Sequence, residues 1–255
     1  MRGLSVFKEK FADYSGNYVV IGGMACLIIF EDVGESFRAT QDVDIVVLME
    51  ENNHDFAAAF WEFIKDGGYQ QIAQGSLHNN FYRFTKPSNS DYPKIIELFA
   101  RKPDGLVLRP DSHTMPIHID EEISSLSAIL LNDEYYKLLL AQKKVIDGIS
   151  VLNELALIPF KVKAFLEINA RRQNGTSEEG ATDNIKKHRR DVFRLARIIS
   201  PTERMFLSTD IKNDMQAFIS IIRDEEVDLS QLGWSGDNAK NEFINLIEEV
   251  YQLKI

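Results

Sequence analysis

The sequence predicts an α+β fold, in which a mixed β-sheet with flanking helices is followed by a mainly helical C-terminal half. Two observations support this class. In the first 130 residues, short runs rich in Val and Ile alternate with amphipathic segments, as strands alternate with helices. From residue 131 onward, apolar residues recur mostly at helical spacing,. We therefore expect two domains, residues 1–130 and residues 131–255.

The first half is expected to begin with a helix and then to alternate strands and helices. Its predicted helices are 3–15, 24–34 and about 52–66, the last ending at Gly67-Gly68,. Its predicted strands are 17–22, 43–49, 79–86, 93–100 and 116–119,. The segment PSNSDY separates two of these strands, which predicts a hairpin.

The second half is expected to contain one short strand among helices. The predicted helices are 133–148, a helix starting at Asn153 or Pro159 and ending near 173, then 183–199, 210–224 and 236–254. GISVL at 148–152 is the strand, and 174–183 is a polar loop,. Asp183 is expected to be the N-cap of the helix that follows this loop.

Composition limits the classes of function. The formal net charge of −10 argues against binding nucleic acid through overall attraction,. However, residues 184–197 carry six Lys or Arg and one Asp, so a local basic face for RNA stays open beside an ordinary solvated helix face. We expect a cytoplasmic protein that does not enter a membrane, because no apolar run has the length of a membrane span, the N-terminus lacks a signal-peptide pattern, and Cys26 is the single cysteine,.

Asp42 and Asp44 interrupt an otherwise apolar strand. Side chains two residues apart on a strand share a face, so these carboxylates project together. They repel each other unless a cation lies between them, and hard oxygen ligands suit Mg²⁺ or Mn²⁺. In the alternative interpretation, one aspartate caps a turn and the other meets solvent.

Gly22-Gly23 separates the strand before these aspartates from a helix. Glycines allow a tight turn, and the free N–H groups of the helix that follows can bind an anion. An ordinary strand-to-helix turn is the alternative. Together with Asp42 and Asp44 on the next strand, the pattern predicts a phosphate site beside a metal site.

A third metal ligand is expected from a later strand. Glu97 lies in the apolar run KIIELFA, and we favour it over Asp120 at the end of PIHID. A solvated position on an edge strand is the alternative for Glu97.

This set of residues resembles the nucleotidyltransferase superfamily that includes polymerase beta, most closely its AbiEii/AbiGii-type abortive-infection toxin branch. The resemblance covers about residues 17–200 and is carried by Gly22-Gly23-x-Ala25, Arg38-x-Thr40-x-Asp42-x-Asp44, Glu97, Lys161 in LIPFKVKAFLEI, and Asp191 in KHRRDVFRL. The sequence departs from the pattern in two places. Many superfamily members have Gly-Ser at the position of Gly22-Gly23, and Arg194 stands where the branch often has a second Asp.

The resemblance implies metal-dependent transfer of a nucleoside monophosphate from a nucleoside triphosphate to an acceptor hydroxyl. The ligands of Mg²⁺ or Mn²⁺ would be Asp42, Asp44 and Glu97, with Glu97 also helping to take the acceptor's proton. The nucleotide-binding residues would be Gly22, Gly23, Arg38, Thr40, Lys161 and Asp191.

Three of these assignments have alternatives. Arg38 can instead be a solvated loop arginine, and Lys161 a solvent-facing lysine. Asp191 can orient Lys161, or it can form a surface ion pair with Lys187 or Arg194.

The toxin branch implies tRNA or a protein hydroxyl as the acceptor and an antitoxin protein as a partner. Two other functions stay open. One is transfer to a small molecule such as an aminoglycoside, which the negative net charge favours,. The other is a relative that binds without catalysis. The last 50 residues resemble no motif of the family.

Overall fold

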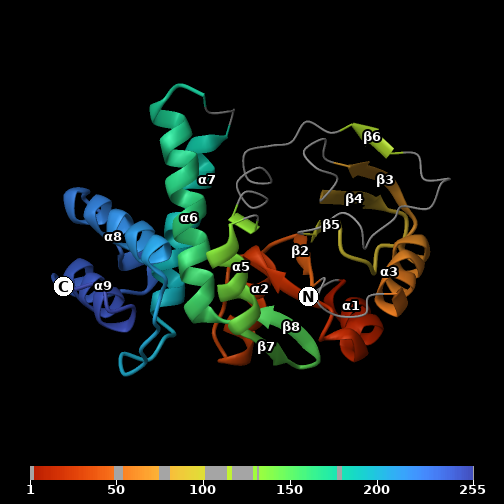
Figure 1. Cartoon of the computed structure of the whole chain (residues 1–255), viewed down its shortest axis with the longest axis horizontal. Coiled ribbons are helices and arrows are strands. Elements are labelled where there is room, and N and C mark those ends of the chain that lie inside the picture. The colour runs from red at the N-terminus through yellow and green to blue at the C-terminus, as the bar shows by residue number, and fades with distance from the viewer. Residues whose placement is uncertain are drawn as a thin grey trace. The chain divides into compact units, whose positions relative to one another are not determined.

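The fold is α+β, as predicted. A computed structural model describes residues 3–48, 54–74, 81–100, 114–116, 129–130, 132–176 and 180–254 (Figure 1). The chain divides into two compact units. The first comprises Met1–Ile119 and Lys143–Asn153, and the second comprises Asp120–Gln142 and Glu154–Ile255. A hairpin that lies beyond the predicted boundary at residue 130 therefore belongs to the first unit.

The first unit is built on an eight-stranded mixed sheet with the order β6-β3-β4-β5-β2-β1-β8-β7. The strands are β1 (Tyr18–Ile21), β2 (Asp42–Val47), β3 (Tyr69–Gln74), β4 (Phe81–Pro87), β5 (Ile95–Ala100), β6 (Thr114–Pro116), β7 (Lys143–Ile146) and β8 (Ile149–Leu152). Strand β2 is internal, antiparallel to β1 and parallel to β5. The predicted hairpin is confirmed, since β4 and β5 pair antiparallel around residues 88–94.

Helices α1 (Leu4–Phe11) and α3 (His54–Gly67) cover one face of this sheet. Their rings form an aromatic cluster with Tyr18 of β1 and Phe84 of β4. Because the strands pair in register, the buried Val43 and Ile45 share that face. The alternate residues, including Asp42 and Asp44, therefore point to the opposite face.

Helix α2 (Gly22–Asp32) follows β1 directly and has buried residues on every side from Gly23 to Phe30. Such an all-apolar helix belongs inside a core. It contacts β1, β2 and β7, so its N-terminus is fixed at the end of β1, close to β2.

The predicted helix over 133–148 is wrong in its second half. Helix α5 (Asp133–Ala141) ends early, and residues 143–152 form the β7–β8 hairpin. Asp147 and Gly148 both have positive φ, at 50° and 82°, as a two-residue type I′ turn requires. An Asp-Gly turn between two β-branched stretches thus prevails over the helical spacing.

Strand β3 was not predicted, because YQQIAQ has few apolar residues. It pairs with β4 and with β6. Its neighbours therefore supply the pairing that its own composition does not indicate. Of the predicted strand 116–119, residues 117–119 lie outside the described residues.

The second unit is helical. In addition to α5, it contains α6 (Glu154–Gln173), α7 (Ala181–Ala196), α8 (Thr209–Asp224), the 3₁₀ turn η3 (Ser230–Leu232) and α9 (Ala239–Val250). Helix α6 contacts α5, α7 and α8, and Figure 1 shows α6 and α7 side by side.

Two predicted helix starts in this unit are decided by the structure. Helix α6 begins at Glu154, just after the predicted Asn153, and Pro159 lies inside it. Helix α7 begins two residues before Asp183, with Gly180 in a left-handed conformation as its N-cap. The N-cap prediction for Asp183 is wrong. This acid instead lies in the first turn, where its negative charge interacts favourably with the helix dipole,.

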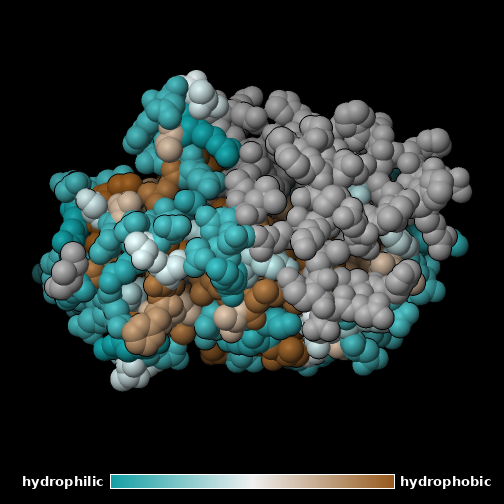
Figure 2. Space-filling view, viewed as in Figure 1, coloured by the Kyte–Doolittle hydropathy of each residue, from teal (hydrophilic) through white to brown (hydrophobic). Residues whose placement is uncertain are grey.

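Within the described residues, no helix is long and apolar enough to cross a membrane. The surface over the C-terminal helices in Figure 2 is mostly hydrophilic, with smaller hydrophobic patches.

Candidate active site

Two of the predicted acids meet on neighbouring internal strands. Asp44 of β2 and Glu97 of β5 are register partners in a parallel pair, so their side chains leave the sheet side by side on one face. Glu97 is 7% exposed. It is therefore a buried acid inside the sheet and not a solvated residue on an edge strand.

The environment of Glu97 disfavours a negative charge. Burial is the largest cause that raises the pKa of this carboxyl well above its ordinary value, and the negative charge of Asp44 raises it further. A hydrogen bond shared with Asp44 and the charge of Asp42 act in the same direction. Arg83 opposes them and lowers the pKa. A raised pKa with these causes is typical of acids crowded together at a buried site.

Arg83 of β4 is the cation beside this pair. Its Nε atom lies 3.2 Å from the Glu97 Oε1 atom. The two residues are register partners of the antiparallel β4–β5 pair. Sequence reasoning missed Arg83. The available signal was a basic residue in an aromatic strand, paired through the predicted hairpin with the strand that carries Glu97.

Gly22 brings the backbone of α2 against Asp44. A Cβ atom added at Gly22 would lie 1.9 Å from the Asp44 Oδ2 atom, and φ of Gly22 is +67°. Both the contact and the conformation require glycine. The first residue of α2 therefore lies directly beside a predicted metal ligand.

Gly23 contacts the two other predicted nucleotide-binding residues of this unit. A Cβ atom at Gly23 would lie 3.1 Å from Thr40 Oγ1 and 3.3 Å from an Arg38 guanidinium nitrogen. Arg38 also lies over the ring of Phe37, which packs against Phe30 of α2. Both Arg38 and Thr40 are half-buried. Arg38 thus lies half-buried beside the N-terminus of α2 and is not a fully solvated arginine.

The acids have the chemistry of a divalent-metal site, and Asp44 and Glu97 share a hydrogen bond there. As the side chains stand, no three His, Cys, Asp or Glu residues in the described parts of the chain are arranged to hold a metal ion. The pair of Asp44 and Glu97 fits such an ion in its donor chemistry, since a cation between them relieves their repulsion. Asp42 is half-buried on the same face, and its part in the site stays a prediction. Asp120, the rival third ligand, lies outside the described residues.

The second unit joins Lys161 and Asp191. The Lys161 Nζ atom lies 3.2 Å from an Asp191 carboxylate oxygen, and the two side chains are 6% and 0% exposed. Arg194 lies 3.9 Å from the other oxygen. The solvent-facing alternative for Lys161 is therefore wrong. The structure shows a buried ion pair between α6 and α7.

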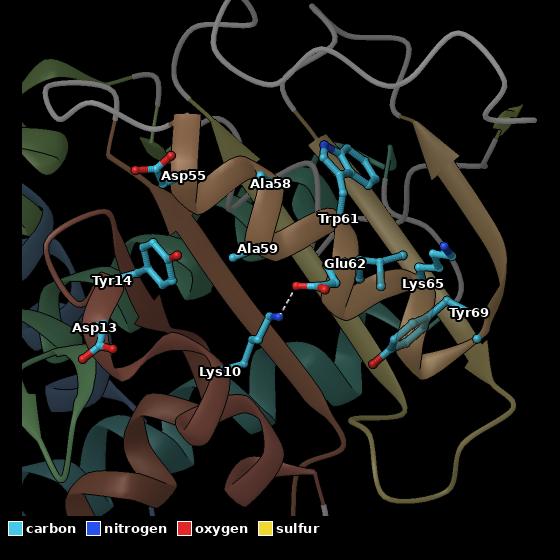
Figure 3. A pocket seen from close by; sticks show the side chains of 12 residues that line it. Lys10, Asp13, Tyr14, Asp55, Ala58, Ala59, Trp61, Glu62, Lys65 and Tyr69 are labelled. Carbon is cyan, nitrogen blue, oxygen red and sulfur yellow. Dashed lines mark hydrogen bonds and ion pairs between the residues drawn. The ribbon is translucent and has the colours of Figure 1, made fainter.

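The cavity in Figure 3 does not have the predicted acids among its lining residues. It has a volume of about 1070 Å³ and is lined mainly by α3, together with residues of α1 and η1 (Ala12–Tyr14). Lys10 and Glu62 point toward one another across it and form an ion pair. Because α1 and α3 cover the other face of the sheet, this cavity contributes nothing to the site of Asp44 and Glu97.

No family model matches this chain, and no curated protein matches it.

Proposed function

We propose that the first unit carries a metal-dependent nucleotidyl-transfer site centred on Asp44 and Glu97. The observation that supports it most is the contact of these two acids on parallel internal strands, with the glycine turn of α2 against Asp44. A buried acid held against a half-buried one in this way costs stability,. A binding role for a cation explains their presence better than a structural role does.

In this proposal, some residues of the site would bind the triphosphate and others would bind the metal ion. The N–H groups of Gly22 and Gly23 at the start of α2, with the guanidinium of Arg38, would bind the triphosphate. Thr40 would support Arg38 against Gly23. Mg²⁺ or Mn²⁺ held by Asp42, Asp44 and Glu97 would stabilise the charge on the attacking and leaving oxygens.

In the proposed reaction, the acceptor hydroxyl oxygen forms a bond to the α-phosphorus of the triphosphate. The bond from that phosphorus to the pyrophosphate oxygen breaks, and pyrophosphate leaves. The hydroxyl proton passes to the Glu97 carboxylate, which lies at the buried end of the site,.

The acceptor defines the biological role. A tRNA or protein acceptor, and an antitoxin partner, belong to the toxin interpretation. A polycationic small molecule is the second candidate, and the net charge of −10 favours it,. Incubation with α-labelled nucleoside triphosphates and total RNA, cell protein or an aminoglycoside panel separates these acceptors by where the label appears.

The enzyme itself is tested by Asp44→Asn. We expect this variant to lose Mg²⁺-dependent triphosphate binding and at least about 100-fold of label transfer, because it removes one electrostatic element of the site. The matched control is Asp55→Asn, which removes an exposed acid from α3 and from the cavity in Figure 3. Equal losses in both variants, or none in Asp44→Asn, would refute the proposal.

A further inference from the structure

Three charged side chains form a row across adjacent strands. Asp44 of β2 is the register partner of Glu97 of β5, and Glu97 is the register partner of Arg83 of β4. Direct partners on paired strands share a face of the sheet. Glu97 therefore stands between an acid and an arginine at one level of the sheet.

The contact on the arginine side is close and shielded. Arg83 Nε lies 3.2 Å from Glu97 Oε1, and the two side chains are 24% and 10% exposed. Such shielding from solvent strengthens an ion pair. Besides Arg83, the charged groups that act on the Glu97 carboxyl are Asp44 and Asp42.

We propose that Arg83 is a positioning residue that holds the Glu97 carboxylate in the orientation needed to bind the divalent metal. This inference rests on the proposed function. A glutamate side chain has three rotatable torsions. Outer partners orient metal-binding carboxylates, and the partner here acts through an ion pair and not through a hydrogen bond from Nε. Loss of such a partner typically costs 10–100-fold in metal affinity.

The direction in which metal affinity changes when Arg83 is replaced distinguishes a positioning role from simple charge repulsion. An arginine that acted only as a nearby charge would repel the metal ion, so its removal would tighten metal binding. An arginine that only stabilised the sheet would leave metal affinity unchanged in the folded variant. Positioning predicts weaker binding that depends on Glu97 and persists at high pH, whereas loss of the pKa-lowering charge of Arg83 would weaken binding only at a pH where protons compete with the metal for Glu97,.

The experiment measures Mn²⁺ affinity of the metal-stripped full chain from the electron paramagnetic resonance signal of free Mn²⁺. The variants are Arg83→Met, Arg83→Lys, Glu97→Gln, the double variant of Arg83→Met with Glu97→Gln, and Asp44→Asn. Lys94→Gln is the matched control, because Lys94 is exposed, lies on the chain just before β5 and contacts Gln41. Cooperative thermal unfolding establishes that each variant is folded. If Arg83→Met does not fold, Arg83→Lys takes its place.

We expect Arg83→Met to weaken Mn²⁺ binding about 10–100-fold, Arg83→Lys to weaken it less, and Lys94→Gln to leave it unchanged. In the Glu97→Gln background, Arg83→Met should have no further effect. Unchanged or tighter binding by Arg83→Met overturns the inference, as does an equal loss with and without Glu97. If Mn²⁺ binds the wild type but not Asp44→Asn, the metal site of the proposed function stands whatever Arg83 does. If wild type and Asp44→Asn alike bind no Mn²⁺, the proposed function fails too.

Discussion

Asp44 and Glu97 are 53 positions apart in the sequence but are direct partners on adjacent parallel strands. They share a hydrogen bond, and the proximity of Asp44 together with burial raises the pKa of Glu97. A sheet built for stability alone would place apolar residues at both positions. This pair is therefore the centre of the candidate site, and its consequences can be measured.

Replacing Gly22 should disable the site more than it destabilises the fold. In Gly22→Ala the new Cβ would displace the Asp44 carboxylate, whose Oδ2 atom is 1.9 Å away. Positive φ adds roughly 1–2 kcal/mol of strain. Gly34→Ala is the matched control, because Gly34 has φ +74° and no atom within 4 Å of the added Cβ. Urea unfolding should show similar losses for both variants, but Mn²⁺ affinity should fall only in Gly22→Ala. Equal metal affinity in the two variants would contradict the assigned contact.

The stability of the metal-free protein should fall as pH rises because of Glu97. Its pKa is raised in the folded protein above the ordinary value of 4.5, so the folded state keeps a proton that the unfolded state releases. Stability then falls by up to about 1.4 kcal/mol per pH unit from pH 4.5 to the folded pKa, and levels off above it. Glu97→Gln should remove this fall, so its advantage over the wild type should grow with pH.

Urea unfolding in EDTA across this pH range measures the effect. Glu62→Gln is the control, because Lys10 lowers the pKa of the exposed Glu62 and the sign is therefore opposite. Parallel stability curves for Glu97→Gln and the wild type would show that Glu97 is not the group responsible.

The buried pair of Lys161 and Asp191 should be costly to break on one side. Lys161→Met or Asp191→Asn should each lower the free energy of unfolding by about 3–5 kcal/mol, since each leaves a buried charge without its nearest ion-pair partner,. The double variant should lose less than the sum of the two. Lys163→Gln is the control, since Lys163 pairs with Asp214 where both side chains are partly exposed, and it should lose about 1 kcal/mol or less. A loss from Lys161→Met as small as that control would show that the ion pair does not hold α6 and α7 together.

Tyr251 should compensate for the proline inside α6. Pro159 cannot donate a backbone hydrogen bond to Leu155, four residues earlier. The Tyr251 hydroxyl donates to that Leu155 carbonyl at 2.8 Å. Tyr251→Phe should therefore cost about 1–3 kcal/mol by leaving a carbonyl unsatisfied.

In a Pro159→Ala background, the restored N–H can bond to Leu155, and the same tyrosine replacement should cost clearly less. Thermal and urea unfolding of the four proteins of this cycle give the coupling between the two positions. Additive losses would mean that Tyr251 stabilises α6 by packing alone.

Local patterns were enough to predict much of the first unit. Alternation of apolar and polar residues predicted β2 and the hairpin of β4 and β5, and an acid in an otherwise apolar strand pointed to Glu97. Local patterns failed at β3, whose polar composition does not indicate that it pairs with β4. They also failed at β7, where the Asp147-Gly148 turn prevails over helical spacing.

Residue chemistry and spacing along the chain were sufficient to select Asp42, Asp44, Glu97 and the Gly22-Gly23 turn, because strand periodicity and glycine conformation are local properties. Only the folded sheet placed Asp44 beside Glu97, Arg83 beside Glu97 and Gly22 against Asp44. Those contacts depend on strand order and register, which arise from pairing between distant segments. Burial, which arises from the same packing, then gives Glu97 the environment that no local pattern could reveal.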